Sequence, residues 1–248
     1  MDIFLRILKG LALGSLQGLT EFLPVSSSGH LILLESFGMG PDLSLNLFLH
    51  VSTLLAVGIA LRKDIWGMIK KPFGKVPVWI IIASVPTAIV AVLFKKFLPT
   101  LLEGALLAPS FMLTAVLLLL PTAKKQRELS WKNSLFVGFC QGLAVLPGIS
   151  RSGATITAMR LSGIEEKNQT KLSFLLSFPV IIGGAAVEIP SVNFDNFDLY
   201  VFIPALLSAF LVGLVALKVM LKAYSSRSAL PFSIYLFALS VFTLVWHG

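Results

Sequence analysis

Residues 14–30 read Gly14-Ser-Leu-Gln-Gly-Leu-Thr-Glu-Phe-Leu-Pro-Val-Ser-Ser-Ser-Gly-His30, which places an amide, a carboxylate, several hydroxyls and an imidazole within an otherwise apolar region. A second segment, Gly138-Phe-Cys-Gln-Gly-Leu-Ala-Val-Leu-Pro-Gly-Ile-Ser-Arg-Ser-Gly153, repeats this pattern. When the two are aligned, Gln141 corresponds to Gln17, and residues 150–153 correspond to residues 26–29. The chain therefore carries two copies of one polar loop, separated by about half of its length.

The composition indicates an integral membrane protein. Of 248 residues, 56% are hydrophobic and only 13% are charged, which is more apolar surface than a soluble core of this size can bury. The net charge of +8 comes from basic residues in short loops between apolar stretches, where they set orientation and contact anionic lipid. We therefore expect the bilayer, and no nucleic acid, as a partner. A homo-oligomer is left open.

The apolar stretches predict six membrane-spanning helices and two hairpins. A helix needs about 20 apolar residues to cross a bilayer, and the stretches that approach this length are 43–61, 76–94, 101–120, 172–189, 199–217 and 229–246. Four other pieces are too short or too interrupted to span: 3–23, 30–39, 133–146 and 153–162. They form two pairs joined by Ser-rich loops, in which Pro24 and Pro147 end a helix and Gly29 and Gly153 permit a turn. We predict two re-entrant hairpins whose loops are buried against each other, since non-helical backbone inside a membrane needs partners.

The repetition extends beyond the loops and predicts the fold. Residues 48–58 align with 174–184, and residues 110–115 align with 233–238. Each half then consists of one re-entrant helix-loop-helix hairpin and three transmembrane helices, and because three is odd the second half is inverted relative to the first. The predicted fold is an all-α integral membrane protein with an inverted-topology repeat. It forms a single domain over residues 1–248, with repeat one at about 1–121 and repeat two at about 133–246.

The loop charges predict which face lies in the cytoplasm. One face collects most of the basic residues: Arg62, Lys63, Lys70, Lys71, Lys75, Lys124, Lys125, Arg127, Lys132, Arg160, Lys167, Lys171, Lys218, Lys222 and Arg227. The other face receives fewer charges: Arg6, Lys9, Lys95, Lys96, Asp195 and Asp198. Basic loops remain in the cytoplasm, so both termini are expected outside.

Arg151 lies at the tip of the second hairpin and belongs to neither surface. An arginine at that depth costs at least about 2.5–3.5 kcal/mol, so it requires a partner. One interpretation is a structural salt bridge to Glu21. The favoured interpretation is that its planar guanidinium binds a phosphate through two hydrogen bonds, because two Ser-rich loop tips and two helix N-termini accompany it.

Gln17, Glu21 and His30 are the other candidate site residues. Gln17 and Glu21 are four residues apart and share one helix face, where they could hold a hard divalent cation or supply a general base. His30 is expected at the start of a short helix, near the arginine and the serines, as an acid, base or nucleophile. His50 is expected at most to support the site. Thr155 either caps the following helix or donates to phosphate.

The two segments closely resemble the signature blocks of the undecaprenyl-diphosphate phosphatases, the bacitracin-resistance family. The resemblance spans essentially the whole chain. It implies hydrolysis of the terminal phosphate of a polyprenyl diphosphate carrier in the bacterial cytoplasmic (inner) membrane, which regenerates the lipid monophosphate for peptidoglycan synthesis. It also implies a divalent cation, magnesium or calcium, and a site that opens on the outer, periplasmic side.

The resemblance also implies roles for individual residues. The catalytic candidates are Glu21, Ser27, His30 and Arg151. The expected substrate-binding residues are Ser26, Ser28, Gly29, Ser150, Ser152 and Thr155. Glu21 and Gln17 are the candidate metal ligands, although Gln17 stands where many relatives carry Glu and provides one negative charge less.

The attacking group and one other function stay open at this point. Ser27, His30 or an ordered water could attack the phosphorus. The alternative function is a flippase for a polyprenyl-phosphate lipid carrier, because inverted repeats with broken helices also occur in transporters. A channel for ions or small anions is less favoured, since no span outside the hairpins carries regular polar positions.

Overall fold

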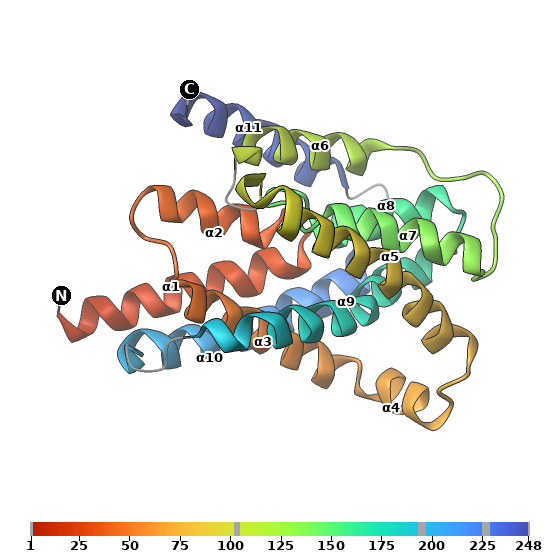
Figure 1. Cartoon of the computed structure of the whole chain (residues 1–248), viewed down its shortest axis with the longest axis horizontal. Coiled ribbons are helices and arrows are strands. Elements are labelled where there is room, and N and C mark those ends of the chain that lie inside the picture. Colours follow the sequence, from red (N-terminus) through yellow and green to blue (C-terminus); the bar gives the residue numbers. More distant parts are fainter. Residues whose placement is uncertain (1, 102–104, 193–196, 225–228, 248) are drawn as a thin grey trace.

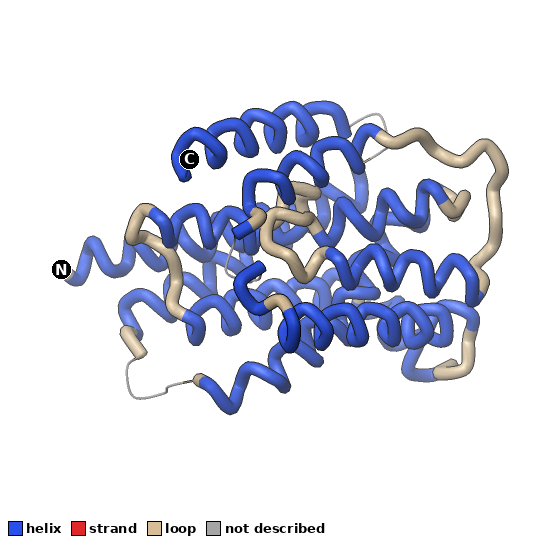
Figure 2. Tube along the Cα trace, turned by 45° about the horizontal axis from the view of Figure 1, so that its top comes forward, coloured by secondary structure: helices blue, strands red, loops and turns tan. Residues whose placement is uncertain are grey.

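The computed structural model describes residues 2–101, 105–192, 197–224 and 229–247, and within these ranges it contains helices and no strands (Figures 1 and 2). The elements in chain order are α1 (Ile3–Phe22), α2 (Ser27–Ser36), α3 (Leu43–Ala60), α4 (Arg62–Lys70), α5 (Lys75–Phe97), α6 (Leu107–Leu119), α7 (Trp131–Leu143), α8 (Arg151–Leu161), α9 (Glu166–Glu188), the 3-10 turn η2 (Ile189–Ser191), α10 (Leu199–Ala223) and α11 (Leu230–His247). The all-helical class is as predicted.

Five of these helices are long and apolar enough to cross a membrane: α1, α3, α5, α9 with its 3-10 extension, and α10. The chain is therefore a multi-pass membrane protein. The prediction that residues 3–23 are too short or interrupted to span is wrong, because α1 is one continuous helix of 20 residues. Gln17 and Glu21 do not break it, since helical backbone groups are satisfied within the helix whatever the side chain. Conversely, helix α6 has 13 residues and is shorter than the predicted 101–120 span, of which residues 102–104 lie outside the described part.

Two turns interrupt the helices in the polar segments. Helix α1 ends at Phe22 and α7 at Leu143, before the prolines, as predicted. Within these two turns the residues with positive φ are Ser26 at 69° and Gly148 at 90°, whereas Gly29 and Gly153 lie inside α2 and α8, so the prediction that these two glycines permit the turns is wrong. Gly29 instead permits a close approach: a Cβ there would lie 2.7 Å from the Phe111 ring and 2.9 Å from the Cα of Gly148.

Helices α1 and α7 pack closely on partners from the other half of the chain. Helix α1 packs on α10, and α7 packs on α5. Gly14 makes the first contact so close that a Cβ would lie 1.9 Å from the carbonyl oxygen of Ala205. Gly138 does the same in the second contact, where a Cβ would lie 2.0 Å from the carbonyl oxygen of Ala83. Small residues at such positions let helix backbones touch, which is how helices associate within a membrane.

The polar segments lie inside this helix assembly. Both chain ends lie at the left of Figure 1, whereas α4 and the connection from α6 to α7 lie at the right. Loop segments occur at the ends of the bundle and also in its middle, where helices surround them (Figure 2). Gln17 is fully buried and Gln141 is 1% exposed, so both copies of the polar pattern face the protein interior.

Replacing Gly14 by Ala is expected to destabilise the protein by about 1–3 kcal/mol, because the added methyl group forces α1 and α10 apart. The measurement is thermal unfolding of the purified protein in detergent. Gly183→Ala in α9 is the matched control, since a Cβ there meets nothing within 4 Å and alanine favours a helix. Equal unfolding midpoints for the two variants would contradict this packing.

Candidate active site

A cavity of 260 Å³ lies where the two polar segments meet. Its walls come from the end of α1, the start of α2, the start of α8 and the turn before it, with further residues from α3, α7 and α9. The polar residues that line it include Glu21, Ser27, His50, Gln141, Ser150 and Arg151. The two halves of the chain therefore build one cavity.

Hydrogen bonds between the two turns hold the cavity together. The backbone N–H of Gly148 donates to Ser26 Oγ at 3.2 Å, and Ser152 Oγ donates to the Leu23 carbonyl at 3.2 Å. Ser26 also caps α2, because its Oγ accepts from the N–H of Gly29 at 3.3 Å. Ser26 thus fixes the start of α2 and its contact with the second turn, and the predicted meeting of the two loops is confirmed.

Glu21 is the centre of the polar contacts. Arg151 Nη2 donates to its Oε1 at 2.6 Å, and Ser27 Oγ donates to its Oε2 at 2.6 Å. Gln17 Nε2 donates to the same Oε2 at 3.1 Å, and His50 Nδ1 lies 3.4 Å from it. The side chain of Glu21 is 5% exposed. A buried carboxylate of this kind is stable only when cations and hydrogen-bond donors surround it.

Ser27 is the hydroxyl best placed for chemistry. It is the first residue of α2, where the positive end of the helix dipole lies, and its proton points to a carboxylate. A hydroxyl hydrogen-bonded to a base is the arrangement that activates a nucleophile.

Three buried polar atoms at or beside the cavity have no hydrogen-bond partner among the described residues: Arg151 Nη1, Gln17 Oε1 and Gln141 Oε1. Buried polar groups are nearly always paired, so unpaired ones at a cavity indicate a polar ligand. Arg151 Nη1 is a charged donor, which favours an anion beside it. The salt bridge to Glu21 and the predicted anion contact can therefore coexist in one guanidinium.

The predicted serines and threonine divide into two groups. Ser26, Ser28 and Ser150 line the cavity together with Ser27. Gly29, Ser152 and Thr155 are not among its lining residues. Thr155 Oγ1 contacts Ser173 Oγ at 2.6 Å and donates to the Arg151 carbonyl at 2.8 Å, so it secures α8 behind the cavity.

His30 lies outside the cavity lining. Its Nδ1 lies 2.7 Å from the Ser26 carbonyl oxygen, and its Nε2 lies 2.6 Å from the Tyr235 hydroxyl of α11. Phe111 packs against the ring edge-on, and Tyr235 stacks on it. The structure thus places His30 beside Ser26 but does not bring it to Glu21 and Arg151.

The sequence predicts at most a supporting role for His50, whereas the structure places it in the cavity lining. Its Nδ1 lies 3.1 Å from Gln17 Nε2 and 3.4 Å from Glu21 Oε2, and it lines the cavity from α3. The repeat gives no signal for it, because the residue aligned with His50 in the second half is Leu176.

Glu21 and Gln17 provide the oxygen atoms that a hard cation would use. Among the described residues no group of three or more His, Cys, Asp and Glu side chains could hold a metal ion alone. Magnesium, however, is commonly bound by one or two carboxylates with substrate phosphates and water supplying the other oxygens. The Glu21 carboxylate and the unpaired Gln17 Oε1, one helical turn apart, fit a cation of that kind.

The chain is similar to known proteins over most of its length. The model of the family described as "Bacitracin resistance protein BacA" matches residues 10–242. The chain is 39% identical over 250 residues to an undecaprenyl-diphosphatase of Carboxydothermus hydrogenoformans, with 96% of each chain covered. It is 37% identical over 248 residues to an undecaprenyl-diphosphatase of Thermosipho melanesiensis, with 95% of this chain and 98% of the relative covered. An undecaprenyl-diphosphatase of Desulforapulum autotrophicum is 35% identical over 275 residues, with 97% and 98% covered.

Proposed function

We propose that the cavity between the two turns is the active site of this chain, which belongs to the bacitracin resistance protein BacA family. The protein hydrolyses undecaprenyl diphosphate to undecaprenyl phosphate and inorganic phosphate. The observation that carries the assignment of the site is the placement of Ser27 and Arg151 on the two oxygens of Glu21. The flippase alternative is not favoured, because binding a carrier headgroup needs no hydroxyl directed at a carboxylate.

Ser27 is proposed to attack the terminal phosphorus. Glu21 accepts the hydroxyl proton as the Oγ–P bond forms, and the bond from phosphorus to the bridging oxygen breaks. Undecaprenyl phosphate leaves with the bonding electrons. Water then hydrolyses the serine phosphate to release inorganic phosphate, and the proton returns to Ser27.

Arg151 is proposed to bind the phosphate that is transferred. Phosphoryl transfer depends mainly on alignment and on neutralising the charge of the non-bridging oxygens. The unpaired Nη1 of Arg151 and the N-terminal ends of α2 and α8 supply donors for this purpose. Ser26, Ser28 and Ser150 add hydroxyl groups on the same wall.

A divalent cation, magnesium or calcium, is proposed as the cofactor, held by Glu21 and Gln17. When bound, it would neutralise charge on the diphosphate. His30 is proposed to hold the backbone of Ser26 through its Nδ1. Ser26 needs this support because positive φ is unfavourable for a residue with a Cβ.

We further infer that the single membrane domain is an inverted-topology repeat, with residues 1–121 and 133–246 as its halves. The pairing of α1 with α10 and of α7 with α5 supports this, since the first helix of each half packs on the corresponding helix of the other half. The distribution of basic residues favours a cytoplasmic position for α4 and the 121–130 connection. The termini and the opening of the site then face the outer, periplasmic side of a bacterial inner membrane.

Replacing Ser27 by Ala is expected to reduce phosphate release from undecaprenyl diphosphate by about 10²–10⁴-fold, because the attacking oxygen is lost. Ser36→Ala, on the same helix with its hydroxyl bound to the Leu33 carbonyl, is the control and keeps its activity. Acid quenching of the wild-type reaction with ³²P-labelled substrate should trap phosphate on Ser27. Near-normal activity in Ser27→Ala would instead assign the attack to water.

A further inference from the structure

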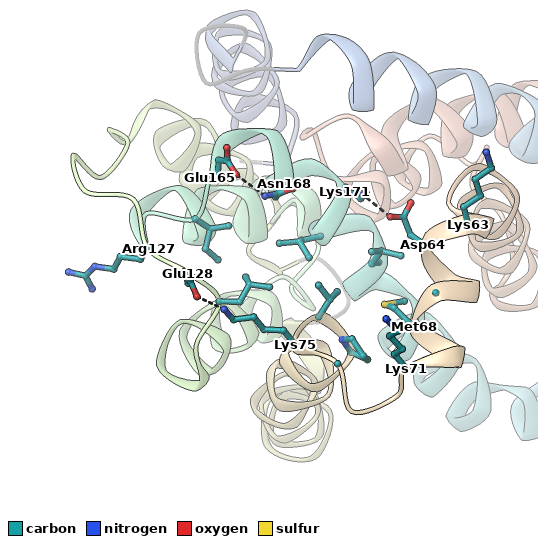
Figure 3. A pocket seen from close by; sticks show the side chains of 18 of the residues that line it. Lys63, Asp64, Met68, Lys71, Lys75, Arg127, Glu128, Glu165, Asn168 and Lys171 are labelled. Carbon is teal, nitrogen blue, oxygen red and sulfur yellow. Dashed lines mark hydrogen bonds and ion pairs between the residues drawn. The ribbon is translucent and has the colours of Figure 1, made fainter.

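A second and larger cavity, of 730 Å³, lies at the opposite end of the molecule from the termini, between α4, α5, α9 and the connection from α6 to α7 (Figure 3). Its basic residues are Lys63, Lys71, Lys75, Arg127 and Lys171. Its acidic residues are Asp64, Glu128 and Glu165. None of these residues belongs to the proposed active site.

Ion pairs neutralise the acidic residues of this cavity. Lys75 forms an ion pair with Glu128, which lowers the pKa of that carboxyl through a hydrogen bond. Lys171 lies 3.0 Å from Asp64. Glu165 lies 2.7 Å from Lys167, outside the cavity lining.

The remaining basic side chains leave the cavity positively charged. Lys63, Lys71 and Arg127 form no ion pair among the described residues. Arg127 points away from the cavity in Figure 3, whereas Lys71 extends beside Met68. A positive charge is thus available at the side of the cavity that Met68 lines.

An apolar groove of 550 Å³ continues from this side. It shares Met68, Pro77 and Leu175 with the basic cavity and runs between α5 and α9. Apart from Ser84, its described lining residues are apolar, and Ser84 donates its hydroxyl proton to the Ile80 carbonyl within its own helix. The basic cavity therefore continues into the apolar groove. This shape and polarity suit a lipid with an anionic head.

Helix α4, which lines the basic cavity, has the features of a helix at the depth of lipid headgroups. None of its residues is buried, and two of its apolar side chains are exposed, Trp66 at 59% and Ile69 at 62%. Phe73, in the following turn, is 91% exposed. Exposed aromatic residues next to lysines are typical of a helix that lies in the membrane interface.

We propose that this cavity and groove form a binding site for an anionic phospholipid of the surrounding leaflet, with its phosphate near Lys71 and one acyl chain along α5. Basic pockets between transmembrane helices bind anionic headgroups in this way. A phospholipid fits better than a free anion because the groove offers it apolar contacts. The bilayer also supplies it at high local concentration.

The test is lipid binding by the purified full-length protein in detergent, measured by native mass spectrometry with phosphatidylglycerol or phosphatidylcholine. The wild type should bind one phosphatidylglycerol more tightly than phosphatidylcholine. A lysine near an anionic headgroup contributes roughly fivefold, so Lys71→Ala should bind phosphatidylglycerol about fivefold more weakly. Lys95→Ala removes an exposed lysine at the other end of α5 and should bind as the wild type does.

A second pair of variants tests the groove. Val85→Trp fills it and should weaken binding, whereas Val92→Trp, two turns further along α5 and outside the lining, should not. Equal binding of the two lipids, unchanged binding by Lys71→Ala, or equal binding by the two tryptophan variants would overturn the proposal. Competition by millimolar inorganic phosphate as strong as that by phosphatidylglycerol would also overturn it and assign the cavity to a free anion.

Discussion

Replacing Arg151 by Ala is expected to lower phosphate release from undecaprenyl diphosphate by about 10³–10⁵-fold, the range over which an arginine that stabilises transferred phosphate acts. Arg151 Nη2 contacts Glu21, and its buried Nη1 has no partner in the described structure. The variant removes the positively charged guanidinium that would contact the phosphate. It also leaves Glu21 without its arginine, so purified protein should be compared with the wild type by thermal unfolding as well as by activity.

Two further variants separate loss of chemistry from loss of structure in this experiment. Arg6→Ala breaks another arginine–carboxylate contact of 2.6 Å, to Asp198, outside the cavity, and should retain its activity. Arg151→Lys keeps the charge but loses the planar two-donor geometry, so it should recover only part of the rate. A folded Arg151→Ala protein that releases phosphate at the wild-type rate would refute the proposed role.

Replacing Glu21 by Gln is expected to reduce the same rate by about 10²–10⁴-fold, the contribution of a general base. The amide has nearly the same shape as the carboxylate, so the cavity should persist. Gln cannot accept the Ser27 proton, however, and it offers a divalent cation no negative charge. Ser27 and Arg151 would each lose an ionised partner.

The cation dependence of this variant is a second readout. Wild-type activity should depend on magnesium or calcium and disappear with a chelator, whereas the residual activity of Glu21→Gln should respond much less to added cation. Glu35→Gln, on the exposed end of α2, is the matched control with unchanged rate and cation dependence. A Glu21→Gln enzyme with the cation response of the wild type would exclude Glu21 as a ligand.

The sequence predicts the site well where the chemistry is local. Gln17 and Glu21 share one face of α1 because they are four residues apart, and their hydrogen bond of 3.1 Å follows from that spacing. The two copies of the polar pattern also predict that the turns meet, which the bond from Gly148 to Ser26 confirms. Repetition and spacing therefore identify the residues that surround the cavity.

Side-chain direction depends on distant residues and could not be predicted in the same way. His30 turns toward Tyr235, which is 205 residues away in sequence, and no local pattern indicates that contact. The sequence predicts Arg160 on the basic loop surface, and this is wrong: Arg160 is 2% exposed and donates to the Leu117 and Leu118 carbonyls at the end of α6. Carbonyls in the last turn of a helix lack the N–H donor four residues further on, and only the folded chain brings Arg160 to them.

The most direct test of the central claim, one active site built from both halves of the chain, is phosphate release by the Glu21→Gln/Arg151→Ala double variant. When two residues act on the same step, the rate losses of the two single variants do not multiply in the double variant. We expect the double variant to be about as slow as the slower single variant, with magnesium present and undecaprenyl diphosphate as substrate. Losses that multiply across the two substitutions would show that Glu21 and Arg151 act independently and would contradict a shared site.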